Sequence, residues 1–358
     1  MSGARQTLRI GLDQRLAAYR AGGISRYALE LGDALAQRPG LELQRLRHHS
    51  DENARPADVT LRTPAHHRFE PLALGVELGL RRLAFDVYHA TDFVAPRLTG
   101  CPVVVTVHDL AFLRWPDQLS RNALAYYRKI RHQARRTAHW ITPSEWTRSE
   151  LQVLLGVDAD DISVIPHGVS GFVGNAPVVP RERREPYLVA VGTVEPRKRY
   201  DLLLDAYERL RPQPRLHIAG APGWNTDALQ ARVRATEGVT WHAAASDVEV
   251  NRLLSNALAL LIPSLAEGFG LGALEALARG TPVISSGLGA LSEVTGPAAF
   301  VPEHDDPASW AQATEHVIHD EAVWQDLSDA GVRRAGEFSW ETAAARTAEV
   351  YRRVALSR

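Results

Sequence analysis

The stretch Leu258–Ser286, LALLIPSLAEGFGLGALEALARGTPVISS, shows the alternation of strand and helix patterns that recurs along the rest of the chain. It begins with a short apolar run, residues 258–262, which has the length of a buried strand. A glycine-rich loop follows, and residues 271–278 are strong helix formers that end at Gly280. Residues 282–286 form a second apolar run. The stretch therefore predicts a strand, a glycine loop, a helix and another strand.

The glycine loop predicts a site for a phosphate or diphosphate. Its residues Gly268, Gly270 and Gly272 lead into a helix N-terminus, which presents backbone N–H groups and the positive end of the helix dipole. Glu267 and Glu275 lie on either side, and a carboxylate accepts hydrogen bonds from hydroxyls. A glutamate at each end of a diphosphate indicates a nucleotide sugar. The alternative is that both glutamates are ordinary helix or loop residues.

This stretch resembles the E-x7-E motif of retaining glycosyltransferases of family 4, and the resemblance extends over nearly the whole chain. It implies an α/β protein of GT-B architecture, with two doubly wound Rossmann-like domains that face each other across a cleft. The alternation of strand and helix patterns predicts the α/β class on its own. We expect an N-terminal acceptor domain at residues 1–170, a linker at residues 171–186 and a C-terminal nucleotide-sugar domain at residues 187–339. A final helix at residues 340–358 is expected to pack back on the first domain.

Length and composition narrow the possible functions. A chain of 358 residues favours two domains. Its 41 basic and 42 acidic residues nearly balance, so the charge indicates no positive electrostatic field that would attract a nucleic acid. The single cysteine, Cys101, excludes an internal disulfide, and no Cys/His pattern indicates a metal, so we expect neither metal nor cofactor. No apolar run reaches the length of a membrane span, and the first residues lack a secretory pattern. We expect a cytoplasmic protein, at most attached to the inner face of the membrane.

A strand-to-helix turn near the N-terminus contains two adjacent glycines. Residues 8–13 read as a strand and residues 24–36 as an amphipathic helix, so Gly22 and Gly23 form the hinge between them. The resemblance implies that this loop faces the donor and the acceptor. An ordinary strand-to-helix turn is the alternative.

A histidine ends another predicted strand, residues 103–108. His108 therefore stands at the carboxyl end of a parallel strand, where open α/β sheets bind their ligands. A histidine at this position can instead be satisfied by a neighbouring backbone carbonyl. The pattern V-x-x-H-D-L resembles the family. It implies that His108 reaches the transferred sugar or the acceptor hydroxyl, and that Asp109 orients the imidazole or binds the acceptor.

A basic cluster lies between a predicted strand, residues 187–192, and a predicted helix, residues 200–210. A departing diphosphate needs positive charge, which Arg197 can supply bidentately and Lys198 as a mobile point charge. A solvated basic turn is the alternative. Relatives often have arginine where this chain has Thr193, which leaves the separate roles of the three basic residues open. The resemblance implies four catalytic residues, which are His108, Glu267, Arg197 and Lys198. It also implies a set of donor-binding residues, which are Gly22, Gly23, Gly192, Thr193, Gly268, Phe269, Gly270, Leu271, Gly272 and Glu275.

Other stretches give weaker predictions. Residues 120–137 read as one long basic helix, either a membrane-facing patch or a solvated face. Residues 50–69 read as a loop, and the D-x-D within residues 158–161 reads as turn chemistry, not a metal site. Ser144 is expected to cap a helix, and Trp224 could cover a nucleotide base or pack in the core.

The resemblance implies a retaining, metal-independent hexosyltransferase. The expected partners are a nucleotide-sugar donor, GDP-mannose before any other, and a hydroxyl of a glycan, lipid-linked or small-molecule acceptor. Glu275 would hold the ribose and Glu267 the transferred sugar. A dTDP- or UDP-sugar such as rhamnose or glucose is the competing donor. An NAD-dependent oxidoreductase and a non-catalytic sugar-binding subunit remain as alternatives of other classes.

Overall fold

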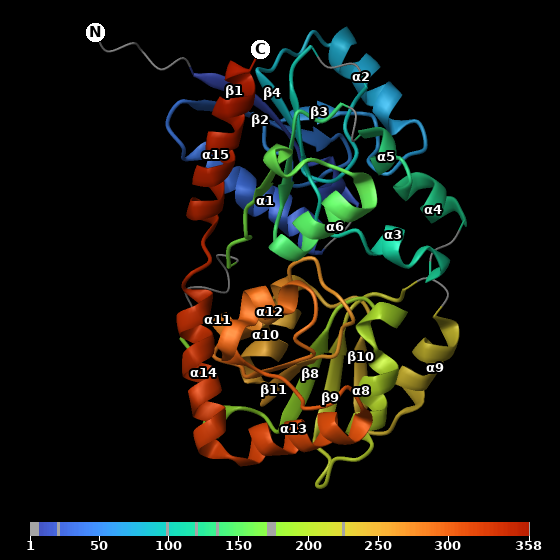
Figure 1. The fold of residues 1–358 in the computed structure, drawn as a ribbon, viewed down its shortest axis with the longest axis vertical. Coiled ribbons are helices and arrows are strands. Elements are labelled where there is room, and N and C mark those ends of the chain that lie inside the picture. The colour runs from blue at the N-terminus through green and yellow to red at the C-terminus, as the bar shows by residue number, and fades with distance from the viewer. Residues whose placement is uncertain are drawn as a thin grey trace. The chain divides into compact units, whose positions relative to one another are not determined.

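The computed structural model divides the chain into two compact units (Figure 1). Unit 1 consists of Met1–Arg114, Arg121–Gly168 and Ser339–Arg358, and unit 2 of Trp115–Ser120 and Val169–Phe338. The structure describes the following residues: 7–19, 22–97, 100–118, 121–133, 136–169, 177–223 and 226–357. Every strand pairing among them is parallel, as alternating strands and helices require.

The sheet of unit 1 has seven strands in the order β3-β2-β1-β4-β5-β6-β7. The strands are β1 (Leu8–Asp13), β2 (Leu41–His48), β3 (Val59–Leu61), β4 (Val87–Ala90), β5 (Val103–Thr106), β6 (His139–Thr142) and β7 (Ile162–Val164). The chain builds outward from β1 in one direction and then from β4 in the other. This doubly wound order creates a switch point between β1 and β4, where ligands bind in such sheets.

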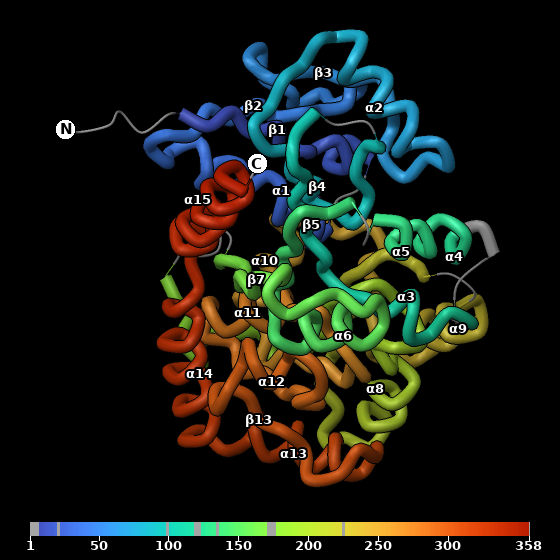
Figure 2. The backbone as a smooth tube through the Cα atoms, turned by 45° about the horizontal axis from the view of Figure 1, so that its top comes forward, coloured from blue at the N-terminus to red at the C-terminus, as the bar shows by residue number. Residues whose placement is uncertain are grey.

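The helices of unit 1 cover its sheet. They are α1 (Gly23–Ala36), α2 (Glu70–Leu80), α3 (Ala111–Arg114), α4 (Arg121–Tyr127), α5 (Ile130–Gln133), α6 (Glu145–Leu155) and α15 (Trp340–Leu356), with 3-10 turns η1 (Arg15–Ala18) and η3 (Ala159–Asp161). The C-terminal helix α15 packs along α1, as Figure 2 shows. Their shared core includes Leu31, Ala344 and Tyr351, all without exposed surface.

Unit 2 repeats the same winding. Its six strands follow the order β10-β9-β8-β11-β12-β13, with a switch point between β8 and β11. The strands are β8 (Tyr187–Val191), β9 (Arg215–Ala219), β10 (Val239–His242), β11 (Ala259–Ile262), β12 (Val283–Ser285) and β13 (Ala299–Phe300). The helices are α8 (Tyr200–Tyr207), α9 (Asp227–Ala235), α10 (Asp247–Asn256), α11 (Leu271–Ala278), α12 (Ala290–Thr295), α13 (Pro307–His319) and α14 (Glu321–Ala335), with 3-10 turns η2 (Pro116–Gln118), η4 (Arg181–Arg183), η5 (Pro196–Lys198) and η6 (Gly296–Ala298).

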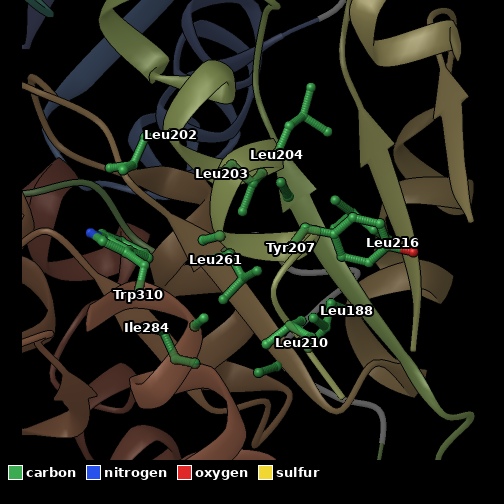
Figure 3. Packing of buried hydrophobic residues seen from close by; sticks show 14 of the residues in the cluster. Leu188, Leu202, Leu203, Leu204, Tyr207, Leu210, Leu216, Leu261, Ile284 and Trp310 are labelled. Carbon is green, nitrogen blue, oxygen red and sulfur yellow. The ribbon is translucent and has the colours of Figure 1, made fainter. Parts of the chain in front are cut away.

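One face of the second sheet packs against α8 and α13. Leu188 and Leu261 project from neighbouring strands toward Leu203, Tyr207 and Trp310 of these helices (Figure 3). The indole of Trp310 is buried, and close packing of this kind resists deformation. The core therefore gives the loops at the carboxyl ends of the strands a rigid support.

Several local predictions are confirmed. The bounds of α11 are those read from the sequence, because glycines precede and follow the helix. The hydroxyl of Ser144 accepts a hydrogen bond from the Thr147 amide at 3.1 Å and caps α6. Asp158 accepts a hydrogen bond from the Asp160 amide at 3.1 Å, so the D-x-D is turn chemistry.

Two local predictions are wrong. The long helix over residues 120–137 is divided into α4 and α5, with a tight turn at residues 128–129. The Lys129 ammonium donates to the carbonyls of His67 at 3.2 Å and Arg68 at 2.9 Å, a tertiary tie that the helical pattern does not contain. The predicted loop over residues 50–69 contains the edge strand β3, which is too short to show alternation.

The described helices include none with the length and apolar character of a membrane span.

Candidate active site

Two loops that the sequence singled out lie together in unit 2. One follows β8 and the other follows β11, and these strands are neighbours at the switch point of the sheet. The carboxyl ends of parallel strands share one edge, so the two loops converge there. The amide of Leu265 donates to the carbonyl of Arg197 at 2.8 Å, which fastens the second loop to the first.

The centre of this edge is the carboxylate of Glu267. The ammonium of Lys198 donates to its Oε1, and so does the hydroxyl of Ser264 at 2.7 Å. The guanidinium of Arg197 lies 3.4 Å from Oε2 and donates to the carbonyl of Ala266 at 3.0 Å. The structure therefore brings three of the four predicted catalytic residues into one cluster.

Electrostatics fix the charge state of this cluster. Burial alone raises the pKa of Glu267, but the charges of Lys198 and Arg197 and the hydrogen bonds from Lys198 and Ser264 outweigh it and lower the pKa to about 2. Glu267 is therefore ionised across the physiological range. An ionised carboxylate accepts hydrogen bonds and donates none, so it can hold hydroxyl groups of a ligand.

Gly192 lets the chain turn immediately after β8. Its φ of 142° is unfavourable for other residues, and a Cβ there would lie 3.3 Å from Cε of Lys198. Its carbonyl accepts a hydrogen bond from the Tyr200 hydroxyl at 2.8 Å. A Cβ at Gly220 would lie 2.0 Å from that same carbonyl oxygen and 3.1 Å from the amide of Thr193. The glycines thus allow two loops to approach beside Lys198.

The structure gives Arg197, Lys198 and Arg199 different partners, whereas the sequence left their separate roles open. Nε of Arg197 donates to Glu195 at 2.7 Å, which holds the guanidinium beside Glu267. Arg199 instead pairs with the exposed carboxylate of Asp305. Lys198 and Arg197 are accordingly the cations of the cluster, and Arg199 belongs to a separate surface pair.

The helix that follows, α11, places its N-terminus at the same edge. Gly270 is the N-cap with φ 99°, and a Cβ there would come within 2.9 Å of the Leu291 side chain. Leu271 begins the helix, and Gly272 faces Val191, to which an added Cβ would lie at 3.7 Å. The first amides of a helix have no acceptor within the helix, which makes this end suited to an anion.

Two predicted donor residues of this segment are buried. The ring of Phe269 is 6% exposed and lies 5.9 Å from the ring of Phe338, within the hydrophobic core. Glu275, one turn into α11, is 3% exposed, and its charge raises the pKa of Arg279 against the larger lowering by burial. The loop residue Gly268 lies between Glu267 and Phe269.

In unit 1, His108 follows β5 and its ring has two protein partners. Nε2 donates to the carbonyl of Thr91 at 2.8 Å, and Nδ1 lies 3.4 Å from Nε2 of His167. Burial lowers the pKa of His108, so the neutral form is favoured. The hydrogen bond to the Thr91 carbonyl fits the alternative that His108 is satisfied by a neighbouring backbone carbonyl. The catalytic role of His108 stays a prediction.

Asp109 caps a helix turn. Its Oδ1 accepts a hydrogen bond from the Ala111 amide at 3.1 Å, at the start of α3. Its charge raises the pKa of His108, though less than burial lowers it. Its role in orienting the imidazole or binding the acceptor stays a prediction.

The N-terminal glycines lie at the start of α1. Gly22 is its N-cap with φ 146°, and a Cβ there would meet no atom within 4 Å. Gly23 is the first helical residue. Trp224, considered as a cover for the base, lies outside the described residues.

A buried charged cluster at the switch point of unit 1 was missed. Nη2 of Arg15 donates to Asp13 at 2.7 Å and to Glu70 at 2.8 Å. The hydroxyls of Tyr88 and Tyr126 donate to these two carboxylates at 2.7 and 2.9 Å. Asp13 ends β1, so its position at a strand end was a readable signal. Glu70 gave none, because the cluster forms only through the fold.

A His–Asp pair beside it was also missed. Nε2 of His66 donates to Oδ2 of Asp92 at 2.7 Å, and the amide of Phe93 donates to Oδ1 at 2.8 Å. Burial raises the pKa of Asp92, but the hydrogen bond and charge of His66, with smaller contributions from His108 and the Phe93 amide, lower the pKa overall. Asp92 lies close enough to His108 for its charge to raise the pKa of that ring. Asp92 stands two residues after β4, which was a usable signal, whereas His66 lies in a loop without periodicity.

Comparisons with known proteins identify the family of the chain. Residues 185–320 match the profile "Glycosyl transferases group 1" and residues 21–170 the profile "Glycosyltransferase Family 4". The chain is 30% identical over 371 residues to O-antigen chain mannosyltransferase B of Escherichia coli, covering 93% of this chain and 97% of that protein. It is 31% identical over 299 residues to the MMP alpha-(1->4)-mannosyltransferase of Mycolicibacterium hassiacum, covering 76% and 72%.

Solved structures share the fold. Sucrose-phosphate synthase from Thermosynechococcus elongatus superposes with a TM-score of 0.80 at 21% identity, covering 98% of this chain and all of that one. Anabaena HepE in complex with UDP-glucose superposes with a TM-score of 0.73 at 16% identity, covering 96% and 99%. The fold is therefore GT-B, and the chain belongs to glycosyltransferase family 4.

Proposed function

We propose that this glycosyltransferase transfers mannose from GDP-mannose, with retention of the anomeric configuration and without a metal ion. The acceptor is a hydroxyl of a glycan, a lipid-linked sugar or a small molecule. The observation that carries the proposal is the convergence of Glu267, Lys198 and Arg197 beside the N-terminus of α11, at the switch point of unit 2.

Each part of this cluster suits one part of a nucleotide sugar. The diphosphate would lie against the first amides of α11 and the cations Lys198 and Arg197, which stabilise charge as the bond to the sugar breaks. Glu267, ionised at every physiological pH, would accept hydrogen bonds from the sugar hydroxyls. Glu275 would hold the ribose, and neutral His108 would meet the sugar or the acceptor.

Retention would follow from a same-face displacement. The acceptor oxygen forms a bond to the anomeric carbon on the side from which the diphosphate oxygen departs. The acceptor proton passes to that departing oxygen, and no base from the protein is needed. This step needs a stabilised leaving diphosphate, which the cation cluster can provide.

Some similar proteins support the assignment of mannose as the transferred sugar, and other similar proteins favour glucose. Both mannosyltransferases named above are about 30% identical to this chain. Glycogen synthase of Mycobacterium tuberculosis is 32% identical over 288 residues, covering 74% of this chain and 68% of that protein, and HepE was solved with UDP-glucose. A UDP- or dTDP-hexose such as glucose or rhamnose is therefore the second candidate.

The donor is tested by calorimetric titration with GDP, GDP-mannose, UDP-glucose, dTDP-rhamnose and NAD. Tightest binding of GDP-mannose is expected, with GDP next. Preference for UDP-glucose or dTDP-rhamnose would replace mannose but keep the mechanism, and preference for NAD would overturn the class. Binding of GDP-mannose without any turnover in the presence of bacterial glycolipid extracts would favour a non-catalytic sugar-binding subunit. Nuclear magnetic resonance of the product gives the anomeric configuration, and an inverted product would contradict retention.

A further inference from the structure

Helix α2 exposes a continuous apolar face. Phe69 at its N-cap and Leu72, Val76 and Leu80 along it are 56%, 50%, 45% and 80% exposed. Spacings of three and four residues place side chains on the same face of a helix. Together with Ala73 they line an open hollow of about 580 Å³. Apolar residues exposed in such a row, rather than singly, indicate an interaction surface.

The helix is held firmly from its other side, so the exposed face is a fixed feature. Leu74 and Leu78 are buried in the core of unit 1. The carboxylate of Glu70 at the first turn accepts a hydrogen bond from Arg15 at 2.8 Å. The carboxylate of Glu77 accepts hydrogen bonds from the Arg62 and Thr63 amides, both at 2.8 Å. The apolar face cannot turn inward without breaking these bonds.

Arginines outnumber acidic residues in the segment that carries the apolar face. Segment 61–83 contains four arginines, and all four are exposed: Arg62, Arg68, Arg81 and Arg82. Of its two acidic residues, Glu70 pairs with Arg15, and Glu77 accepts hydrogen bonds from backbone amides and pairs with Arg81 at 3.2 Å, so Arg81 shares its charge with Glu77. An apolar stripe between cationic side chains is the pattern of a helix that lies in the surface of an anionic bilayer.

We propose that the α2 face, made of Phe69, Leu72, Val76 and Leu80 with its flanking arginines, docks on the surface of an anionic phospholipid membrane. The apolar side chains enter the boundary between headgroups and acyl chains, and the arginines meet the lipid phosphates. A second copy of the chain fits this face less well, because pairing two such faces would bring arginines against arginines. The proposal moves the expected membrane contact from residues 120–137 to α2.

The location of Lys129 supports that shift. Its ammonium donates to the carbonyls of His67 and Arg68 and lies 4.3 Å from the ring centroid of Tyr126. Through these contacts Lys129 holds the segment that leads into α2. The basic helix predicted from sequence therefore contributes to positioning the α2 face.

Vesicle sedimentation tests the proposal, using vesicles of phosphatidylcholine alone and of phosphatidylcholine mixed with phosphatidylglycerol. The wild-type protein is expected to bind the anionic vesicles at least about tenfold more tightly than the neutral ones. The double variant Val76→Asp/Leu80→Asp is expected to lose at least about tenfold in that binding. Val248→Asp is the matched control, since Val248 is also an exposed apolar residue, 77% exposed, on α10 of the other unit.

A second pair of changes separates charge from apolar contact. Arg81→Gln/Arg82→Gln should reduce the preference for anionic vesicles while leaving the thermal unfolding temperature near that of wild type, because both side chains are exposed. Circular dichroism of every variant establishes that the fold is kept. Absence of binding to either vesicle, or undiminished binding by the aspartate double variant, would overturn the proposal. A wild-type dimer that Val76→Asp/Leu80→Asp dissolves, without vesicle binding, would assign the face to a second copy instead.

Discussion

Lys198 and Glu267, 69 positions apart in the chain, form an ion pair at the carboxyl edge of the second sheet. Both side chains are largely buried, with 13% and 11% of their surface exposed. A pair held in this way is preorganised: the cation and the carboxylate are fixed before any ligand arrives. In the proposed function the diphosphate competes with Glu267 for Lys198, while the carboxylate turns to the sugar hydroxyls.

Glu267→Gln should separate recognition of the sugar from recognition of the nucleotide. The amide keeps the size of the side chain but loses its charge and half of its acceptor capacity. We expect GDP to bind at least as tightly as in wild type, because Lys198 loses a competing charge, the preference for GDP-mannose over GDP to fall by about tenfold, and transfer to fall by about a hundredfold. Calorimetric titration with both ligands measures the first two effects.

The control for that variant is Glu303→Gln, because the Glu303 side chain is 87% exposed in the same unit. It should bind both ligands as wild type does. Wild-type turnover by Glu267→Gln would show that the site has been placed wrongly.

Lys198→Ala should weaken GDP itself. The ammonium is expected to contact the diphosphate in both GDP and GDP-mannose, so both affinities should fall together by about tenfold or more. Transfer should fall further, because the charge on the leaving group increases as the bond breaks. An unchanged affinity for GDP would separate Lys198 from the diphosphate and contradict the assignment.

The same ion pair predicts how stability depends on pH. The pKa of Glu267 is about 2 in the folded protein, below its ordinary value of 4.5. The ionised form therefore contributes stability that is complete above about pH 4.5 and is lost as the pH falls toward 2, about 3 kcal/mol in all. Lys198→Met removes the largest attractive charge and should lose most of this contribution.

Urea unfolding followed by tryptophan fluorescence measures that effect. The difference in unfolding free energy between wild type and Lys198→Met should be constant from neutral pH down to about pH 5 and should shrink below it. A difference that stays the same down to the acid end would mean that the pair does not set the ionisation of Glu267.

Gly220→Ala should disturb the approach of the loops beside Lys198. An added Cβ would lie 2.0 Å from the carbonyl oxygen of Gly192, a backbone atom that cannot rotate away. We expect a loss of about 2–4 kcal/mol in unfolding free energy and weaker binding of GDP. Gly79→Ala is the control, because a Cβ at this helical position meets nothing within 4 Å and should be neutral or slightly stabilising. Equal effects of the two changes would argue against close loop contact.

What could be read from the sequence was local. The helix Leu271–Ala278 has its predicted bounds, because glycines mark both ends and apolar residues fill the interval. The D-x-D turn and the Ser144 cap likewise depend on residues two or three positions apart. Such features follow from backbone chemistry that neighbours share.

What the sequence could not give depends on strand order. Glu267 and Lys198 meet because β11 pairs with β8, and no spacing along the chain encodes that neighbour relation. Lys129 was expected in a continuous helix, but its bonds to carbonyls sixty-one and sixty-two positions away favour a turn instead. Tertiary contacts of this kind override local helix propensity.

Arg15→Met tests the buried charged cluster of unit 1. The guanidinium is 1% exposed and bonds both Asp13 and Glu70, so its removal leaves two buried carboxylates facing each other. Removing one partner of a buried ion pair costs about 3–5 kcal/mol, and urea unfolding should show a loss of that size. Arg9→Met is the control, because Arg9 and Asp86 are 3.9 Å apart with 47% and 32% of their side chains exposed, and it should cost less than about 1 kcal/mol.

Adding Glu70→Gln to Arg15→Met should recover part of the lost stability. The amide removes one of the two uncompensated charges and can still accept the hydrogen bond from the Tyr126 hydroxyl, which donates to Glu70 at 2.9 Å in the wild type. Burial already raises the pKa of Glu70 and the Arg15 charge opposes that rise, so without the arginine the carboxyl should take up a proton more readily. Arg15→Met alone should therefore regain stability as the pH falls below neutral, and the double variant should regain less, because only the Asp13 carboxylate is then left without its cation. Parallel pH profiles for the two variants would mean that the loss comes from packing rather than from unpaired charge.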